Sequence, residues 1–252
     1  MRQIYPAERE VSGASLAEAY AYPDSTRPWV RADMVASVDG AATLAGRSGG
    51  LSGAADREVF ALLRFLADVI LVGAGTARAE GYQPVRPYEG AQWAGLRAGR
   101  PATPPIAVVT AKIDLDLESP LLTTAPPDAR TVIITTEAAP PERLAAAAAT
   151  AEVIVAGETM VDPRAAIEGL TGLGHRRILT EGGPHLLSQL TEAGLMDELC
   201  LTLSPLLTGP GVGRIVEGGV GLALAPQPLA LAHVLADEGF LLCRYVRAGS
   251  AA

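Results

Sequence analysis

The stretch RRILTEGGPHLLSQL, residues 176–190, joins an apolar run to two glycines and a proline, and then to an amphipathic run. This order predicts a buried strand, a tight turn and a helix that begins at Pro184, because proline is tolerated in a first helical turn. DVILVGAGT, residues 68–76, has the same strand and glycine turn. Glycines at such turns let a ligand approach the backbone, whose amides can donate to phosphate oxygens. The two units predict a ligand site at the carboxyl ends of strands, where α/β folds hold their ligands.

Short apolar runs alternate with helical patterns from residue 28 onward. Runs rich in Val, Ile and Leu without strict alternation are typical of strands that are buried on both faces of a sheet. The predicted strands are residues 29–37, 68–73, 106–110, 131–136, 152–156, 176–181, 198–205 and 240–247. The predicted helices are residues 54–67, 140–149, 163–170 and 184–191, and residues 81–105 are predicted to form an irregular surface loop.

The order of these elements predicts an α/β fold of three layers, in which a mixed, mainly parallel sheet is flanked by helices. Residues 1–27 are polar and punctuated by proline, with one short helical stretch, and are interpreted as an N-terminal extension. Residues 28–252 are interpreted as a single domain, because a chain of 252 residues does not demand two.

The charge distribution restricts the classes of partner. The chain carries 28 acidic and 20 basic residues, a net charge of −8, and its basic residues are scattered. This argues against nucleic acid as the main partner but allows a phosphorylated small molecule, which one or two arginines can bind. No apolar run reaches the roughly 20 residues of a membrane span, and the N-terminus lacks a signal-peptide core. We therefore expect a cytoplasmic protein that does not contact membranes.

The cysteines give no sign of a metal site. Cys200 and Cys243 both lie in apolar runs and are predicted to be buried and reduced. The chain has no C-x-x-C pair and lacks the H-x-E and P-C-x-x-C signature of zinc deaminases. The first glycine turn also departs from the Rossmann fingerprint, because Arg78 stands where G-x-G-x-x-G needs glycine or alanine. A dinucleotide would therefore be held by a different fold.

Three segments in register resemble one known family. They are RPWVRADMVASVDGAATLAGRSGGLSG (27–53), DREVFALLRFLADVILVGAGTARAEGYQPVR (56–86) and ILTEGGPHLLSQLTEAGLMDELCLTLSPLLTGPG (178–211). Together they resemble the reductase half of the bifunctional riboflavin-biosynthesis deaminase–reductase, and most of all the single-domain pyrimidine reductase family of actinobacteria. The resemblance spans about residues 28–247. It implies a dihydrofolate-reductase-like fold and a homodimer built partly on the strands at 198–205 and 240–247.

The resemblance also implies a reaction and a cofactor. It implies an NADPH-dependent reductase of 5-amino-6-(5-phosphoribosylamino)uracil, in which hydride is transferred to the imine carbon derived from the ribose. The absence of the acidic ribose-binding residue of NAD-type folds favours NADPH over NADH. The residues that the resemblance assigns to NADPH are Gly73, Gly75, Thr76, Thr110, Gly182, Gly183, Pro184 and Leu186.

The substrate residues implied by the resemblance come from the remaining motifs. They are Ser37, Asp39, Ser48, Arg64, Arg86 and Glu181. Both arginines would take the ribose phosphate, for which the planar guanidinium is suited. Asp39 and Glu181 are the candidates for electrostatic or proton-transfer assistance, and the sequence does not separate these roles.

Two departures from the family pattern leave alternatives open. Ala41 stands where the family often has a basic residue, and Gly50 where an aromatic residue is expected. A paralogous reductase of a pterin-like or dihydrofolate-like substrate therefore remains a second interpretation. A nucleotide-binding module without turnover is a third, although a pure sensor would not need the acidic residues and arginines of a substrate pocket.

Overall fold

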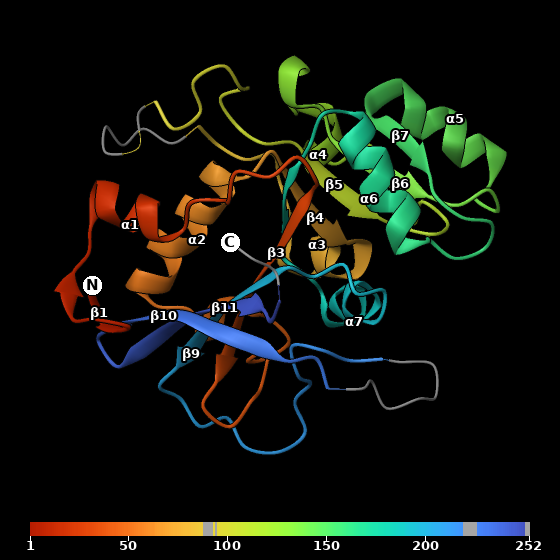
Figure 1. The fold of residues 1–252 in the computed structure, drawn as a ribbon. Coiled ribbons are helices and arrows are strands. Elements are labelled where there is room, and N and C mark those ends of the chain that lie inside the picture. Colours follow the sequence, from red (N-terminus) through yellow and green to blue (C-terminus); the bar gives the residue numbers. More distant parts are fainter. Residues whose placement is uncertain (88–92, 94, 219–225, 250–252) are drawn as a thin grey trace.

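The computed structural model describes residues 1–87, 93, 95–218 and 226–249. Its strands form one sheet, in the order β2-β1-β10-β11-β9-β3-β8-β4-β5-β6-β7 (Figure 1). The strands are β1 Arg2–Tyr5, β2 Arg9–Glu10, β3 Trp29–Ser37, β4 Val69–Gly73, β5 Ile106–Val109, β6 Val132–Thr135, β7 Glu152–Val155, β8 Arg177–Thr180, β9 Glu198–Ser204, β10 Leu229–Asp237 and β11 Phe240–Arg247. The helices are α1 Gly13–Ala19, α2 Ala54–Leu66, α3 Ala74–Glu80, α4 Pro120–Thr123, α5 Pro141–Thr150, α6 Pro163–Gly172 and α7 Pro184–Glu192.

Helices cover both faces of the parallel part of the sheet. On one face, α2 buries a stripe at spacings of three and four, including Val59, Leu62 and Leu66, in one core cluster with Ile70 of β4. On the other face of the sheet, α6 and α7 pack against strand residues such as Leu71 of β4. Leu170 of α6 is buried in this second core cluster. Each fully buried Leu contributes on the order of 2 kcal/mol by leaving water. The predicted three-layer α/β class is confirmed.

The strand directions place several carboxyl ends along one edge. β9, β3, β8, β4, β5, β6 and β7 run parallel, whereas β11, β10, β1 and β2 add antiparallel pairs. β3 pairs with β8 as far as Ala32 opposite Thr180, and then continues to Ser37 beside β9 alone. The sheet therefore opens between β3 and β8 just beyond Thr180.

The predicted strands all occur, within about two residues of their predicted ends. The structure adds β10, which was not predicted, and β1 and β2 from the N-terminal extension, where β1 pairs with β10. The prediction that residues 81–105 lie on the surface is wrong in part. Trp93 and Arg97 are buried, and Nη1 of Arg97 donates to the carbonyls of Phe65 and Ala67, 2.9 and 2.7 Å away. These bonds satisfy carbonyl groups at the end of α2.

A buried ion network joins the strands of the antiparallel end. The carboxylate of Glu198 lies 2.7 Å from Nε of Arg31 and 2.8 Å from Nε of Arg244, and it accepts a 3.0 Å bond from Nε1 of Trp29. The side chains of Arg31 and Glu198 are fully buried. The Arg31 guanidinium also stacks on Tyr22, 4.0 Å from the ring centre. Glu198 thereby links β3, β9 and β11, and Arg31 connects them to the N-terminal extension.

The composition-based expectations can be compared with the described residues. Cys200 and Cys243 are free and buried, as predicted. Within the described ranges, no group of three or more His, Cys, Asp or Glu side chains could hold a metal ion. No helix in the same ranges is both long enough and apolar enough to cross a membrane.

Candidate active site

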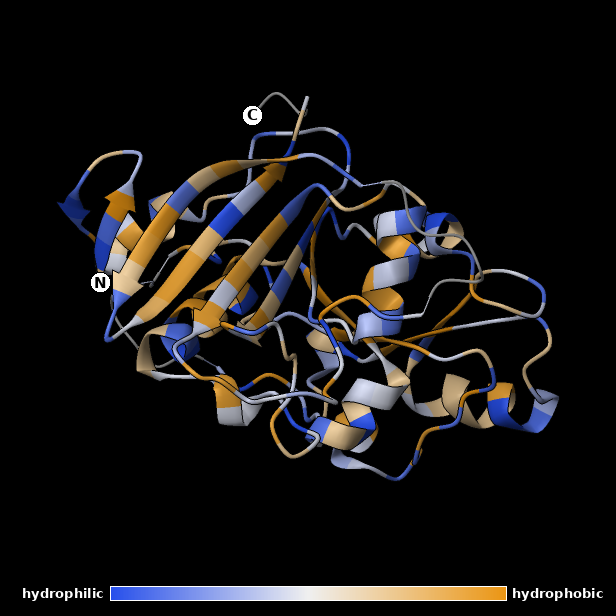
Figure 2. Cartoon of the chain, turned by 90° about the horizontal axis from the view of Figure 1, so that it is seen from below, coloured by the Kyte–Doolittle hydropathy of each residue, from blue (hydrophilic) through white to orange (hydrophobic). Residues whose placement is uncertain are grey.

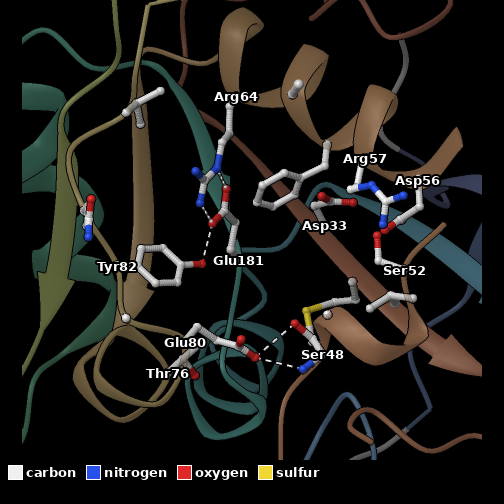
Figure 3. A pocket seen from close by; sticks show the side chains of 18 of the residues that line it. Asp33, Ser48, Ser52, Asp56, Arg57, Arg64, Thr76, Glu80, Tyr82 and Glu181 are labelled. Carbon is white, nitrogen blue, oxygen red and sulfur yellow. Dashed lines mark hydrogen bonds and ion pairs between the residues drawn. The ribbon is translucent and has the colours of Figure 1, made fainter. Parts of the chain in front are cut away.

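A cavity of about 750 Å³ lies where β3 and β8 separate. Its size is that of sites that hold a small molecule or cofactor. One wall is the face of α2 that carries Phe60 and Arg64, and another is the segment of residues 79–86. β3 contributes residues 33–35, and the turn after β8 contributes Glu181, Gly183 and Pro184. Figure 3 shows polar side chains from all these elements directed into one space.

The two glycine turns meet at the edge of this cavity. The amide of Gly73 donates a 2.8 Å bond to the carbonyl of Gly182, so the turn after β4 lies against the turn after β8. The Gly182–Gly183 peptide is cis, and a side chain at Gly183 would collide with Oγ1 of Thr76. A Cβ atom at Gly75, in contrast, would meet nothing within 4 Å. The turns therefore form one continuous backbone surface with open space beside Gly75.

Glu181 is held by two other residues that line the cavity. Its carboxylate accepts bonds of 2.6 and 2.7 Å from Nε and Nη2 of Arg64, and one of 2.5 Å from the hydroxyl of Tyr82. Burial disfavours the charged guanidinium, but the adjacent carboxylate outweighs this effect and raises the pKa of Arg64. Burial and Glu181 both raise the pKa of Tyr82. Arg64 is therefore paired within the site, and a phosphate contact from it would require this ion pair to open.

Asp33 is a cavity residue that the sequence analysis missed. It lies on β3, and none of the described residues donates a hydrogen bond to its carboxyl group. Burial raises the pKa of Asp33 well above the usual carboxyl value, and the charges of Asp56 and Glu181 raise it further. The available signal was a carboxylate inside a buried strand, which is costly unless it is paired or serves a function.

With this geometry in place, known proteins can be compared with the chain. The model of the RibD C-terminal domain matches residues 28–238. The chain belongs to the RibD C-terminal domain family. The resemblance drawn from the sequence is confirmed, and with it the assignment to the pyrimidine reductases of riboflavin biosynthesis, which are oxidoreductases.

Individual relatives agree with this family. A 2,5-diamino-6-ribosylamino-4(3H)-pyrimidinone 5′-phosphate reductase of Archaeoglobus fulgidus is 31% identical over 186 residues, which make up 73% of this chain and 83% of that protein. A pyrimidine reductase-like protein of Corynebacterium diphtheriae is 29% identical, with a TM-score of 0.78 over 87% of this chain and 92% of that one. RibD of Acinetobacter baumannii shares the fold, with a TM-score of 0.70 at 18% identity over 88% of this chain and 58% of that one.

The residues assigned to the cofactor fall into two groups in this RibD C-terminal domain. Thr76, Gly183 and Pro184 line the cavity, and Gly73, Gly75 and Gly182 belong to the turns that form its edge. Thr110 and Leu186 are not among the lining residues. Oγ1 of Thr110 accepts a 3.1 Å bond from the amide of Asp114. Leu186 lies on α7, and its side chain is buried in the core between α7 and the sheet. Contact of these two residues with a cofactor stays a prediction.

The substrate candidates Ser48 and Arg86 both line the cavity. The amide and the hydroxyl of Ser48 donate to the carboxylate of Glu80 at 2.8 and 3.0 Å, which fixes the loop that carries Ser48. Arg86 is exposed. Arg57 is a second exposed lining arginine and was missed by the sequence analysis. The sequence did contain a sign of its role. Arg57 lies three residues before Phe60 and seven before Arg64, a spacing that places all three on one helix face.

Asp39 lies on a turn outside the cavity lining, so the structure does not bring it together with Glu181. Oδ2 of Asp39 accepts bonds of 2.9 and 3.1 Å from the amides of Gly209 and Thr208, and the buried Ser37 hydroxyl donates to Oδ1. The bonds from Ser37, Gly209 and Thr208 lower the pKa of Asp39 to about 2. The visible role of Asp39 and Ser37 is to tie the turn after β3 to residues 208–209, and a catalytic role for Asp39 stays a prediction.

Proposed function

We propose that the chain is an NADPH-dependent reductase of a ribosylaminopyrimidine 5′-phosphate, in which hydride is delivered to the imine carbon derived from the ribose. The observation that carries this proposal is the contact between the two glycine turns at the wall of a cavity that also holds a carboxylic acid, an ion pair and exposed arginines. The archaeal relative, whose name specifies a ribosylamino-pyrimidinone 5′-phosphate, supports this substrate class.

The glycine turns fit the diphosphate of a nicotinamide nucleotide. Backbone without side chains at Gly75 and Gly183 permits close approach, and no atom of the described residues lies within 4 Å of a Cβ atom placed at Gly75. Thr76 places a hydroxyl between the two turns. The bound cofactor would supply a hydride, while the protein aligns donor and acceptor and keeps water away from them. The ion pair of Glu181 and Arg64 would fix the wall beside the reacting carbon.

The substrate phosphate is assigned to Arg86 and Arg57. Both line the cavity and are exposed, and neither has a hydrogen bond or ion pair with another described side chain. Arg64 is already engaged by Glu181. A guanidinium binds a phosphate through two charge-assisted hydrogen bonds.

Replacing Arg86 by alanine is expected to lower kcat/KM for the phosphorylated substrate about 10- to 100-fold, since a charge-assisted contact contributes roughly 1.5–3 kcal/mol. Arg57→Ala should act in the same direction, and NADPH affinity should not change. Kinetics of the wild type and the variant, each with phosphorylated and dephosphorylated substrate, give a double-mutant-type cycle that isolates the contact between the arginine and the phosphate. Arg130→Ala, which removes an exposed arginine outside the cavity lining, is the matched control. Equal losses with and without the phosphate would contradict the assignment.

The direct test of the proposed function follows NADPH absorbance after mixing with 5-amino-6-(5-phosphoribosylamino)uracil, with the 2,5-diamino-pyrimidinone analogue, or with dihydrofolate. Turnover of either ribosylamino compound supports the proposal. Turnover of dihydrofolate alone would support the paralogous reductase instead, an alternative that Ala41 and Gly50 keep open. The two ribosylamino compounds differ at one exocyclic position of the ring, so their relative rates also show which of them is preferred.

We also propose that the chain forms a homodimer through the uncovered face of β9, β10 and β11. Leu203 and Val234 on this face are half-buried, and Leu241 is 38% exposed. Leu201 and Tyr245, on the same face, pack in part against the small core cluster that contains Leu187 and Met196. Figure 2 shows these strands in front, with no helix of the described chain over them. Covering such an apolar sheet face would remove it from water. A second copy supplies a self-complementary surface.

Light scattering at micromolar concentration is expected to give twice the 26.0 kDa chain mass. Leu241→Arg should shift the protein to the monomer by placing a charge in the apolar interface. Val155→Arg is the matched control, because Val155 is an exposed apolar residue on β7 at the opposite end of the sheet. A wild-type monomer would rule out the dimer. A Leu241→Arg variant that keeps the mass of the dimer would rule out this interface.

A further inference from the structure

Asp33 lies where the sheet opens. Ala32 opposite Thr180 is the last pair between β3 and β8, so Asp33 and Glu181 are the next residues on the two separating chains. Gly182 and Gly183 follow directly, and the adjacent Met34 has its sulfur 3.4 Å from where a Cβ atom at Gly182 would lie. Asp33 therefore lines the cavity at the point where the two strands separate, across from Glu181.

Of the two carboxyl groups at the point where β3 and β8 separate, Asp33 is the one free to hold and release a proton. The Glu181 carboxylate is occupied by Arg64 and Tyr82, whereas no described residue donates to Asp33. Figure 3 shows Asp33 between that ion pair and the Asp56 and Arg57 side chains of α2.

The charges around Asp33 come from several elements. Burial is the largest cause of its raised pKa, followed by the charges of Asp56 on α2 and Glu181 after β8. The positive charges of Arg64 on α2 and Arg31 on β3 act in the opposite sense and do not reverse the shift. A carboxyl group in these surroundings retains its proton at a higher pH than one in water.

The proposed reaction requires an acid at this point. In a ribosylamine the anomeric carbon is bonded to the ring oxygen and to nitrogen, and hydride can add only after the bond to the ring oxygen has broken. The nitrogen lone pair forms the C=N bond of an iminium ion, and the departing oxygen must gain a proton. Hydride from the nicotinamide donor then adds to that carbon. One proton and one hydride are consumed, and the oxidised cofactor is released.

We propose that Asp33 is the general acid that protonates the ring oxygen of the ribosylamine, so that the sugar opens to the iminium ion that is reduced. This inference rests on the proposed function. Asp33 gives up its proton as the carbon–oxygen bond breaks, and it is reprotonated from solvent after product release. Asp33 lines the same cavity as Gly183 and Thr76, so the acid and a nicotinamide donor bound there can act on the same carbon.

The test is Asp33→Asn, which preserves the size of the side chain and removes its acidic proton. We expect kcat to fall about 100- to 10,000-fold, the contribution of a positioned general acid, while NADPH affinity in a fluorescence titration stays unchanged. In the wild type, kcat/KM should decline as the pH rises through the pKa of Asp33, because the protonated form is active. Asp33→Asn should lack this alkaline decline, and Asp33→Glu should recover part of kcat.

Asp56→Asn provides the matched variant in the same cavity. Removing the negative charge of Asp56 should lower the pKa of Asp33, so the alkaline decline should move to lower pH instead of disappearing. An Asp33→Asn variant with the kcat and pH profile of the wild type would overturn this inference but not the proposed function. A variant that changes only KM would have the same consequence. A wild type that reduces no ribosylaminopyrimidine would overturn the proposed function and this inference together.

Discussion

Replacing Glu198 by glutamine is expected to lower the free energy of unfolding by about 3–5 kcal/mol, because breaking a buried ion pair leaves uncompensated charge in the interior. Glu198 is fully buried, and it is the carboxylate within reach of both Arg31 and Arg244. A neutral amide would leave two guanidinium groups without their counter-charge. Urea unfolding followed by circular dichroism measures the change. Glu152→Gln, an exposed position on β7, should stay within about 0.5 kcal/mol of the wild type.

The dependence of stability on pH gives a second measurement of the same network. Burial opposes ionisation of Glu198, but Arg31 and Arg244 outweigh it and lower its pKa from 4.5 to about 2. Because the folded pKa lies below the unfolded one, this stabilisation is complete above about pH 5 and is lost as the pH falls toward 2. Glu198→Gln should lack this part of the acid sensitivity. A variant as stable and as acid-sensitive as the wild type would contradict the role of the network.

Replacing Gly75 by aspartate is expected to lower NADPH affinity about 100-fold. A carboxylate about 5 Å from a phosphate at an effective dielectric constant of about 20 costs roughly 3 kcal/mol. The fold should not lose stability. A Cβ atom at Gly75 meets nothing within 4 Å, and Asp is favourable in the first turn of a helix such as α3. Fluorescence titration gives the affinity, and thermal unfolding gives the stability.

Gly75→Asn separates charge from size, since it adds a neutral side chain of the same shape. It should weaken NADPH binding less than Gly75→Asp, and the difference between the two variants should shrink as salt screens the added charge. In the wild type, NADPH should bind more tightly than NADH. A Gly75→Asp variant that binds NADPH as tightly as the wild type would show that the turn after β4 does not face the cofactor phosphates.

The sequence predicted the parts of the fold in which the local pattern and the final environment agree. The central strands are continuous apolar runs, and α2 carries its buried stripe at regular spacing. β10 was missed because LALAHVLAD contains three alanines and a histidine, residues with little preference for strands. Its pairing with β1 joins segments that are far apart in the sequence, which no local pattern encodes. Its pairing with β11, in contrast, is a hairpin closed by Glu238 and Gly239.

Several residues that line the cavity were candidates from the sequence, but their pairings were not predicted. Glu181 and Arg64 were both candidates, yet they are 117 positions apart, and their ion pair emerges only when α2 packs over the end of β8. Asp33 was hidden within a strand that was interpreted as core. The substrate role of Asp39 stays a prediction, and its bonds to Thr208 and Gly209 were not foreseen because they depend on a loop about 170 residues later. Such contacts follow from tertiary packing and are not local in sequence.

The most direct test of the proposed reaction is the fate of the transferred hydrogen. The protein would be incubated with a ribosylaminopyrimidine 5′-phosphate and NADPH carrying deuterium at the transferred position, and the product would be analysed by mass spectrometry and NMR. We predict a ribitylamino product with one deuterium on the carbon attached to nitrogen, formed in proportion to the NADPH consumed. A product with deuterium elsewhere, or NADPH oxidation without a ribityl product, would contradict the proposed function.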